Sequence, residues 1–276
     1  MDSEKIYSDL KNKFPNLEIF QNHSLAPYTT VKIGGPADIF IHTTNSKDFI
    51  EILKSLPNQP ITILGNGSNV LISDSDIRGI VIKNDSNVIE ILPNNQIKVD
   101  SGVQLSQLIN FTLNNNLLGL EEFAYIPSTI GGAITGDIHG VNKTHFSKFV
   151  TSVEKYNDFI ISTVLNLTPG DPTTAKTQVK EIIQKKSAIQ SMNSLGSVFK
   201  NIEGKDPTGM IIDQQLNLKG YSIGGAQISP LHANFIVNNG QATATDYFSL
   251  IQLIQSKAQE ILGFQFELEI KLLGQF

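Results

Sequence analysis

Cysteine is absent from this sequence of 276 residues, and arginine occurs once, as Arg78. The absence of cysteine excludes disulfides, thiolate catalysis and cysteine-ligated metals, and it is compatible with a reducing compartment. Long apolar runs are also missing. No segment approaches the roughly 20 residues of a membrane span, and the N-terminus has no apolar core of signal-peptide length. We therefore expect a protein that crosses no membrane and stays in the cytoplasm.

Positive charge is scarce as well. The 26 acidic residues outnumber the 21 basic ones, which gives a formal net charge of -5. Phosphate backbones attract clustered cations, and the sequence shows no such cluster, so a general affinity for DNA or RNA is excluded. His139 and His232 each lack a second histidine or carboxylate at ligand spacing. We expect scaffold roles for both histidines and no metal site.

The composition and length fit a globular protein of two or three domains. Hydrophobic residues make up 40% of the chain and charged residues 17%, which is ordinary for soluble domains. Strand and helix signals alternate in the first third, after a short amphipathic helix that carries Ile6, Leu10 and Phe14. Periodicity predicts helices over 46–56, 105–117 and 173–186, and strands over 38–41, 61–64, 80–83, 88–91, 97–99 and 159–167, with an apolar stretch at 70–72.

Helix-end signals are clear in the second half of the chain. Asp171 is suited to the N-cap of the predicted helix at 173–186, and Pro172 to its first position. A final helix has an apolar stripe from Tyr247 to Ile261 and is predicted to stop at Gly263. The tail at 265–272 alternates apolar and polar residues, which predicts a strand.

A loop of small residues follows the predicted strand at 61–64. It reads Gly65, Asn66, Gly67, Ser68 and Asn69. Successive backbone amides in such a turn can form a concave site for a pyrophosphate, although a tight surface turn is the commoner use of glycine and asparagine. The spacing is not that of the GxGxxG fingerprint, so a Rossmann fold is not predicted.

A second loop, at 125–140, is rich in glycine, serine and threonine. Pro127 fixes its entry, and the hydroxyls of Ser128 and Thr129 can donate hydrogen bonds. Gly131 and Gly132 permit a close approach of the backbone to a ligand. A loop buried between domains has the same composition, so both interpretations stay open.

Two residues of the last third can carry chemistry. Ser197 follows a glycine turn, close to Lys200 and Asn201, and a hydroxyl held in this way can deliver a proton to a carbanionic carbon. An isolated serine is more often structural, and no GxSxG pattern indicates a hydrolase. Glu269 shares a predicted strand face with two other charged residues. That face is a solvated edge by default, and a functional role requires it to line a cleft.

Seven segments in order resemble the UDP-N-acetylenolpyruvoylglucosamine reductase family, also called UDP-N-acetylmuramate dehydrogenase. Each is weak alone, whereas the ordered set is highly specific and covers nearly the whole chain. The segments are 29–37, 64–71, 119–121 with 126–133, 196–201, 218–220 with 224–227, 232–238 and 269–274.

The resemblance implies an α+β or α/β fold with a two-part FAD-binding region of the vanillyl-alcohol-oxidase (PCMH) type and a C-terminal α/β substrate-binding domain. We place the FAD-binding subdomains at 1–84 and 85–187, the second shortened near 154–158, and the substrate domain at 188–276. The implied reaction uses NADPH to reduce FAD, whose N5 passes hydride to an enolpyruvyl UDP-sugar. The product, UDP-N-acetylmuramate, serves peptidoglycan synthesis and hence cell shape and division. We expect a monomer.

The resemblance also implies roles for individual residues. Ser197 matches the family's proton-donating serine, and Glu269 matches a glutamate that acts with an arginine at the substrate carboxylate. Asn201, and Lys200 beside it, match the substrate-contacting part of the serine loop. The flavin pyrophosphate is expected on Gly65–Asn69, with further contacts from Pro127, Ser128, Thr129, Gly131 and Gly132.

The sequence departs from the family pattern near 154–158. A Tyr-Arg pair normally precedes the strand at 159–167, but about two dozen residues of the usual pattern are missing here. No residue inherits the arginine's role by position, because Arg78 lies outside every matching segment. A lysine replaces the charge but not the planar two-point grip on a carboxylate. We expect an exposed sheet edge beside Phe159, and a non-catalytic flavin- or UDP-sugar-binding paralogue is one alternative.

A second departure lies in the loop from Gly136 to Gly140. Its Asp-Ile-His-Gly stretch resembles the corresponding loop of some sugar oxidases in the wider flavin superfamily. A carbohydrate oxidase is therefore a third hypothesis, although the C-terminal segments favour the reductase.

Overall fold

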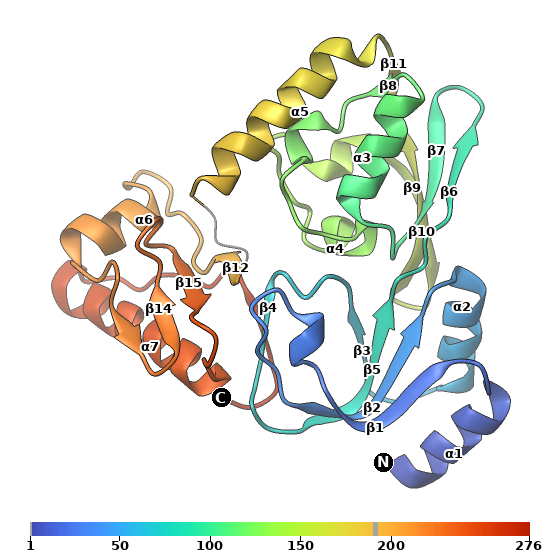
Figure 1. Ribbon diagram of the computed structural model, residues 1–276, viewed down its shortest axis with the longest axis horizontal. Coiled ribbons are helices and arrows are strands. Elements are labelled where there is room, and N and C mark those ends of the chain that lie inside the picture. Colours follow the sequence, from blue (N-terminus) through green and yellow to red (C-terminus); the bar gives the residue numbers. More distant parts are fainter. Residues whose placement is uncertain (1, 190–192) are drawn as a thin grey trace. The chain divides into compact units, whose positions relative to one another are not determined.

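The computed structural model describes residues 2–189 and 193–276 (Figure 1). Contacts within the chain divide it into two compact units. Unit 1 consists of Met1–Gln21, Ile39–Asn66 and Gly79–Lys186. Unit 2 consists of Asn22–Asp38, Gly67–Arg78 and Ser187–Phe276. The predicted division into domains at 1–84, 85–187 and 188–276 remains a prediction. Two short N-terminal segments, Asn22–Asp38 and Gly67–Arg78, group with the C-terminal residues in unit 2.

The first sheet has the strand order β1-β2-β5-β3, and helices α1 and α2 share a core with it. Strands β3 and β5 run parallel, with Ile61 opposite Ile80. Helix α2 begins where the sequence predicts, because the side chain of Asn45 accepts the N–H of Asp48 at 2.8 Å and so caps it. The elements are α1 (Ser3–Lys13), β1 (Glu18–Ser24), η1 (Ala26–Tyr28), β2 (Pro36–Thr43), α2 (Ser46–Ser55), β3 (Ile61–Leu64) and β5 (Ile77–Asn84).

The second sheet has the order β6-β7-β10-β9, with antiparallel neighbours throughout. Helices α3 and α4 cover it, since Leu108 of α3 and Ile130 of α4 share a core with Val99 of β7 and Leu165 of β10. The elements are β6 (Ile89–Leu92), β7 (Gln96–Asp100), α3 (Leu105–Asn114), β8 (Leu117–Leu118), η2 (Glu121–Phe123), α4 (Ile130–Thr135), η3 (Phe146–Phe149), β9 (Val150–Tyr156), β10 (Phe159–Asn166), β11 (Thr168–Pro169) and α5 (Pro172–Ser187).

Helix α3 is shorter than predicted. It ends at Asn114 instead of continuing to 117, because Asn116 takes a left-handed φ of 57° and Leu117 pairs with Pro169 in the small β8–β11 ladder. Helix α5 confirms its predicted start at Pro172. The carboxylate of Asp171 accepts the N–H of Thr173 at 3.0 Å, as an N-cap does.

The shortened region near 154–158 is a hairpin. β9, which the sequence analysis did not predict, pairs antiparallel with β10, with Tyr156 opposite Phe159. The two-residue turn between them places Asn157 at a φ of 52°, a left-handed conformation that asparagine tolerates. The sequence predicts an exposed sheet edge at the strand that contains Phe159, which is β10. Among the described strands, β10 is paired on both sides and β9 forms the edge of the sheet.

Unit 2 contains a sheet of order β12-β15-β14-β13, and helix α7 contacts β13 and β14 (Figure 1). Helix α7 ends as predicted, with Gly263 in the left-handed C-cap conformation at a φ of 75°. Strand β16 pairs in parallel with β4, which follows the Gly65–Asn69 loop. The elements are β4 (Val70–Ile72), β12 (Ser194–Ser197), α6 (Thr208–Met210), η4 (Ile211–Gln215), β13 (Ser222–Ile223), β14 (Ala226–Ile228), β15 (Phe235–Asn238), α7 (Ala244–Leu262) and β16 (Lys271–Leu273).

The C-terminal tail forms a strand only in part. Phe266 and Ile270 are buried and the charged residues between them are exposed, so the predicted alternation is present. Regular strand geometry is confined to Lys271–Leu273. The tail changes partner along its length: Leu268 forms a bridge with Phe199, and the residues from Lys271 onward pair with β4. A single uninterrupted strand over 265–272 was therefore the wrong prediction.

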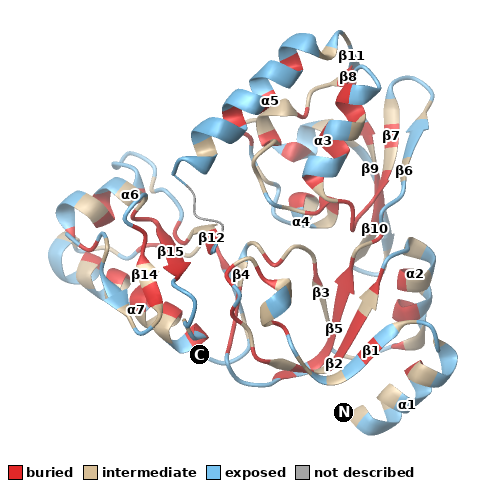
Figure 2. Ribbon diagram, viewed as in Figure 1, coloured by how far each residue is buried: buried red, intermediate tan, exposed pale blue. Residues whose placement is uncertain are grey.

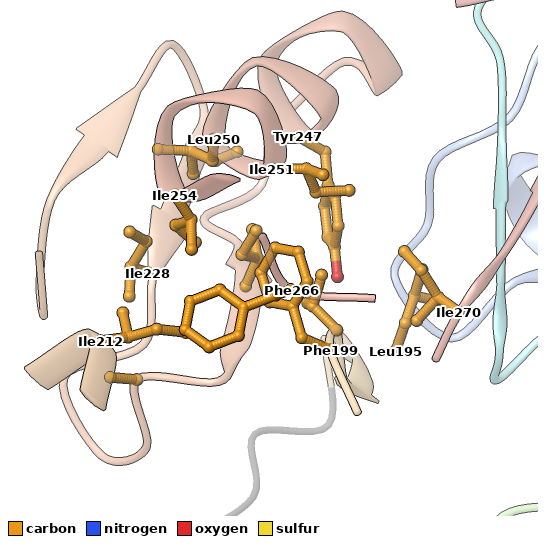
Figure 3. Packing of buried hydrophobic residues seen from close by; sticks show 14 of the residues in the cluster. Leu195, Phe199, Ile212, Ile228, Tyr247, Leu250, Ile251, Ile254, Phe266 and Ile270 are labelled. Atoms are coloured by element: carbon orange, nitrogen blue, oxygen red, sulfur yellow. The ribbon is translucent and has the colours of Figure 1, made fainter. Parts of the chain in front are cut away.

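Buried side chains lie along the strands and on the inward faces of the helices (Figure 2). In unit 2, helix α7 directs Tyr247 and Ile251 into a core that contains Phe199 and Phe266 (Figure 3). None of the helices in the described ranges is both long enough and apolar enough to span a bilayer.

Candidate active site

Within unit 1, the two small-residue loops meet. Gly65 directly follows β3, and a Cβ placed on it would lie 2.6 Å from the Thr129 hydroxyl oxygen. Thr129 is the N-cap of α4, and its hydroxyl accepts the N–H of Gly132 at 3.3 Å. Only glycine leaves room for the close approach of residue 65 to Thr129. Gly65 therefore allows the first loop to pack against the start of α4.

An amide pair fixes Asn66, the next residue. Its Nδ2 donates to Oε1 of Gln104 at 2.5 Å, and Nε2 of Gln104 donates to Oδ1 of Asn66 at 2.6 Å. Gln104 also bridges to Thr129, and the N–H of Leu105 donates to the Ser128 carbonyl at 2.8 Å. Gln104 therefore joins both predicted loops. Sequence reasoning missed it, because a lone glutamine 38 residues from its partner carries no local signal.

A third segment supports the start of α4. The N–H of Gly131 donates to the Ser101 carbonyl at 2.7 Å, and a Cβ on Gly131 would lie 3.1 Å from that same oxygen. Ser101 is buried and its hydroxyl accepts from Nδ2 of Asn84 at 2.9 Å. The backbone of 101–104 thus fixes the glycine pair, while Pro127 and Gly132 are exposed.

Within unit 2, Gly67 continues the first loop in a conformation that side chains disfavour. Its φ is 59°, and an added Cβ would lie 2.3 Å from the Tyr28 carbonyl oxygen. The N–H of Thr30 donates to the Gly67 carbonyl at 3.1 Å. The loop is therefore held by the 28–30 segment, which overlaps the first of the seven family-like stretches. Ser68 and Asn69 follow Gly67 directly.

Asn69 connects the first loop to the C-terminal tail. Its carbonyl accepts the N–H of Lys271 at 2.9 Å, and its Nδ2 donates to the Glu269 carbonyl at 3.3 Å. Parallel pairing of β4 with β16 continues this contact. Glu269, which is 200 residues away in sequence, is thereby placed against the end of the glycine loop.

The same tail connects Glu269 to the serine loop. The N–H of Glu269 donates to the Val198 carbonyl at 2.9 Å, and the bridge of Phe199 with Leu268 is antiparallel. Glu269 therefore lies opposite Val198, one residue from Ser197. Gly196 has a φ of 75° and lies between Ser194 and Ser197, where the pairing of β12 with β15 shifts register. Such an irregularity in a strand sets the direction of the side chain that follows it, here Ser197.

Lys200 and Asn201 also have protein partners. Nζ of Lys200 lies 3.1 Å from a carboxylate oxygen of Glu267, and both side chains are more than half exposed. Oδ1 of Asn201 accepts the N–H of Thr208, the first residue of the short helix α6, at 2.9 Å. Their substrate contacts remain predictions, and an exposed ion pair such as this one contributes little stability.

The histidine loop of unit 1 has a network of its own. Asp137 takes a φ of 39°. Its carboxylate accepts the N–H of Ser147 at 3.1 Å and lies 2.9 Å from Nδ1 of His145. Hydrogen bonds from Ser147, with a further contribution from His145, lower the pKa of Asp137. The ring of His139 meets the ring of His145 edge-on, at 6.3 Å between centroids.

His232 of unit 2 contacts its own loop, since its Nδ1 accepts the N–H of Asn234 at 3.3 Å and its ring stacks on Phe235. Across residues 2–189 and 193–276, no group of three or more histidine, aspartate or glutamate side chains is placed to hold a metal ion.

Arg78 forms a salt bridge with Asp38. Its NH1 lies 2.9 Å from the carboxylate of Asp38, which is 10% exposed. The arginine is on β5 and its partner is on β2, so it ties neighbouring strands together.

Close packing of the chain explains the glycines at 65 and 67, and the loop that they form is compatible with a bound pyrophosphate. At Gly65 and Gly67 the neighbouring chain occupies the space of a Cβ, and backbone without side chains is what a pyrophosphate needs for close approach. A family model for the FAD binding domain matches residues 37–157, and a model for the C-terminal domain of UDP-N-acetylenolpyruvoylglucosamine reductase matches residues 186–273.

Whole-chain relatives carry the same name. The UDP-N-acetylenolpyruvoylglucosamine reductase of Listeria monocytogenes is 33% identical, with 97% of this chain and 99% of the relative aligned. That of Carboxydothermus hydrogenoformans is 31% identical with both chains fully covered. The Listeria alignment spans 298 positions, more than the 276 residues of this chain, so the relative has residues that this chain lacks.

A solved structure agrees with the sequence relatives. The UDP-N-acetylenolpyruvylglucosamine reductase of Thermus caldophilus matches with a TM-score of 0.79 and 27% identity, over 94% of this chain and 99% of the other. These matches confirm FAD as a cofactor and the expected fold of an FAD-binding region followed by a C-terminal domain. The chain belongs to the UDP-N-acetylenolpyruvoylglucosamine reductase family of FAD-dependent oxidoreductases.

Proposed function

We propose that this protein reduces UDP-N-acetylenolpyruvoylglucosamine to UDP-N-acetylmuramate with NADPH, as a cytoplasmic step of peptidoglycan precursor synthesis. One observation carries the proposal. The backbone of Glu269 is hydrogen-bonded both to Asn69, at the end of the glycine loop, and to Val198, beside Ser197. Within unit 2, Asn69, Glu269 and the residue beside Ser197 are therefore neighbours in space, although they lie far apart in sequence.

The residues of this chain supply binding, charge stabilisation and a proton. When bound, FAD takes hydride from NADPH and supplies it to the enolpyruvyl carbon. The hydride leaves electron density on the neighbouring carbon and its carboxylate, which the site must stabilise. Ser197 donates the proton that completes the product, and Glu269 acts at the carboxylate end of the substrate.

The remaining proposed roles concern binding. Gly65–Asn69 and the Pro127–Gly132 loop hold the flavin pyrophosphate. Lys200 and Asn201 contact the UDP-sugar. Both occupy the segment directly after Ser197, so a substrate held there is presented to the serine.

We propose that turnover is slower than in relatives with the family arginine. Arg78 is bound to Asp38, and a lysine does not reproduce the bidentate grip of a guanidinium on a carboxylate. Removing one preorganised stabilising group typically costs on the order of 10²–10³ in rate. The expected product is unchanged, because the arginine stabilises charge and supplies neither hydride nor proton.

Steady-state consumption of NADPH under anaerobic conditions tests the proposal. We expect NADPH oxidation that depends on UDP-N-acetylenolpyruvoylglucosamine, with one equivalent of a product two mass units heavier than the substrate (about 2 Da for two hydrogens added in a hydride and a proton). Saturable FAD or UDP-sugar binding without any turnover contradicts the proposal and supports a binding paralogue. Hydrogen peroxide formed from simple sugars and oxygen supports a carbohydrate oxidase.

A further inference from the structure

Asn234 is a buried asparagine whose side chain forms both of its hydrogen bonds with one residue of the serine loop (residues 196–201), namely Phe199. It lies immediately before β15 and is 4% exposed. Its Oδ1 accepts the N–H of Phe199 at 3.0 Å, and its Nδ2 donates to the carbonyl of the same residue at 2.8 Å. The amide thus satisfies both backbone groups of Phe199, as a neighbouring strand would.

The main chain of Asn234 adds to this contact. Its carbonyl accepts the N–H of Val198 at 2.8 Å, so two consecutive residues after Ser197 are bonded to one asparagine. The opposite edge of the segment is bonded to the tail, through Glu269 to Val198 and through Lys200 to Glu267, each at 2.9 Å. The backbone following the serine is held on both sides.

The side chain of Phe199 completes the anchor. It is fully buried, and its ring lies 5.4 Å from that of Phe266. Because the ring is fixed in the core and the peptide is fixed by Asn234, Val198 and Phe199 have little freedom. Ser197 stands at the end of this rigid segment, after the left-handed Gly196.

We propose that Asn234 is a positioning residue that fixes the hydroxyl of Ser197 for proton transfer. This inference rests on the function proposed above. In the step concerned, the Oγ–H bond of Ser197 breaks and a C–H bond forms at the carbon beside the substrate carboxylate. Hydride from NADPH, supplied through FAD, would add to the other carbon of the enolpyruvyl double bond. The π pair of that bond then moves to the carbon beside the carboxylate and takes the serine proton, and water reprotonates the serine.

The hydrogen-bonding pattern requires an amide at position 234. Phe199 presents one donor and one acceptor, and only an amide offers the matching acceptor and donor in one plane. Aspartate keeps an acceptor for the Phe199 N–H but sets a second oxygen against the Phe199 carbonyl. Alanine leaves both buried backbone groups unpaired, which is costly.

The test compares the two half-reactions in Asn234→Asp and Asn234→Ala, each measured anaerobically by flavin absorbance in stopped flow. We expect reduction by NADPH to stay within about twofold of the unsubstituted protein, and reoxidation by UDP-N-acetylenolpyruvoylglucosamine to slow by roughly tenfold or more, as part of the 10²–10⁴ that a positioned acid contributes. Reduction in the same sample reports whether the variant is folded and holds flavin.

A second buried asparagine provides a matched control. Asn238 is the last residue of β15 and is 8% exposed. Its side chain donates to the Val31 carbonyl at 2.8 Å and accepts from Gly240 at 2.7 Å. Asn238→Ala loses comparable hydrogen bonds away from the serine loop. It should lower the melting temperature while leaving the ratio of the two half-reaction rates unchanged.

A double substitution separates positioning from general damage. If Asn234 acts through Ser197, then Asn234→Asp should slow reoxidation no further in a Ser197→Ala background, because coupled residues are not additive. An additive loss overturns the inference. So do equal slowing of both half-reactions, reoxidation at the unsubstituted rate, or variants that retain no flavin. If the unsubstituted protein itself is not reoxidised by substrate, the proposed function fails first and this inference fails with it.

Discussion

The residues next to Ser197 in the chain determine where its hydroxyl lies. The left-handed Gly196 precedes it, and the bonds of Val198 and Phe199 follow it. We predict that Ser197→Ala slows reoxidation of the reduced flavin by substrate by about 10²-fold or more, the typical contribution of a positioned acid. Reduction by NADPH should remain nearly intact, because hydride transfer to the flavin requires no proton from this serine. Stopped-flow absorbance measures both, and equal loss in both steps means that the serine has another role.

The buried hydroxyl of Tyr247 lowers the stability of the fold. Its ring is fully buried, and among residues 2–189 and 193–276 its hydroxyl is the one buried side-chain polar atom without a hydrogen-bond partner. Burial alone raises the pKa of this phenol far above its ordinary value, so it stays neutral at any pH that the fold tolerates. A buried unpaired hydroxyl costs roughly 1–3 kcal/mol.

We therefore predict that Tyr247→Phe raises the free energy of unfolding by about 1 kcal/mol, because the ring keeps its contacts and the unsatisfied hydroxyl is removed. Urea unfolding measures the change. Tyr28→Phe is the matched control, since the Tyr28 hydroxyl is 3.1 Å from Nε2 of His23 and its removal loses a bond. If Tyr247→Phe destabilises the protein, its hydroxyl has a partner after all.

Individual site residues were predictable only where the local sequence is unusual. The glycine loop has this character, and the structure shows why glycine is needed at Gly65 and Gly67. Gln104 and Asn234 were not predicted. Each works through a partner more than thirty residues away, and a single amide side chain has no periodicity or motif that indicates such a contact.

At the scale of elements, a two-residue turn closes the β9–β10 hairpin, the region that the sequence predicts to be shortened. We predict that Asn157→Val lowers the free energy of unfolding by roughly 1–2 kcal/mol, because a β-branched residue is strained at the observed φ of 52°. Asn157→Gly should be nearly neutral, since glycine adopts this conformation freely. Urea unfolding of both variants is the measurement. Equal stability of the two would mean that the turn does not have this geometry.

Element ends fixed by local chemistry were predicted, whereas pairings fixed at a distance were not. Asp171 and Gly263 mark their helix ends by capping, which depends on a few adjacent residues. β9 has an irregular exposure pattern and acquires its strand geometry from β10. The tail at 265–272 alternates as a strand should, but its hydrogen bonds pass from one partner segment to another, which no pattern within the tail indicates.

At the scale of the whole molecule, the family is recognised from the order in which the seven family-like segments occur along the sequence. Seven short stretches predicted the family, the FAD cofactor and the fold, and the family matches and the solved relative confirm all three. An alignment longer than this chain shows that the relative has additional residues, and their location near 154–158 remains a prediction. The effect of the missing arginine on rate was not predictable from the fold, because it depends on how strongly the remaining groups stabilise charge at the substrate carboxylate.

We propose above that this chain transfers hydride from a bound flavin to an enolpyruvyl UDP-sugar, with Ser197 completing the product. A single experiment tests this transfer: the FAD-loaded protein is reduced with one equivalent of NADPH under anaerobic conditions, and UDP-N-acetylenolpyruvoylglucosamine is then added. We expect the absorbance of oxidised flavin to return as UDP-N-acetylmuramate forms in equal amount. Flavin that stays reduced after the substrate is added would contradict it.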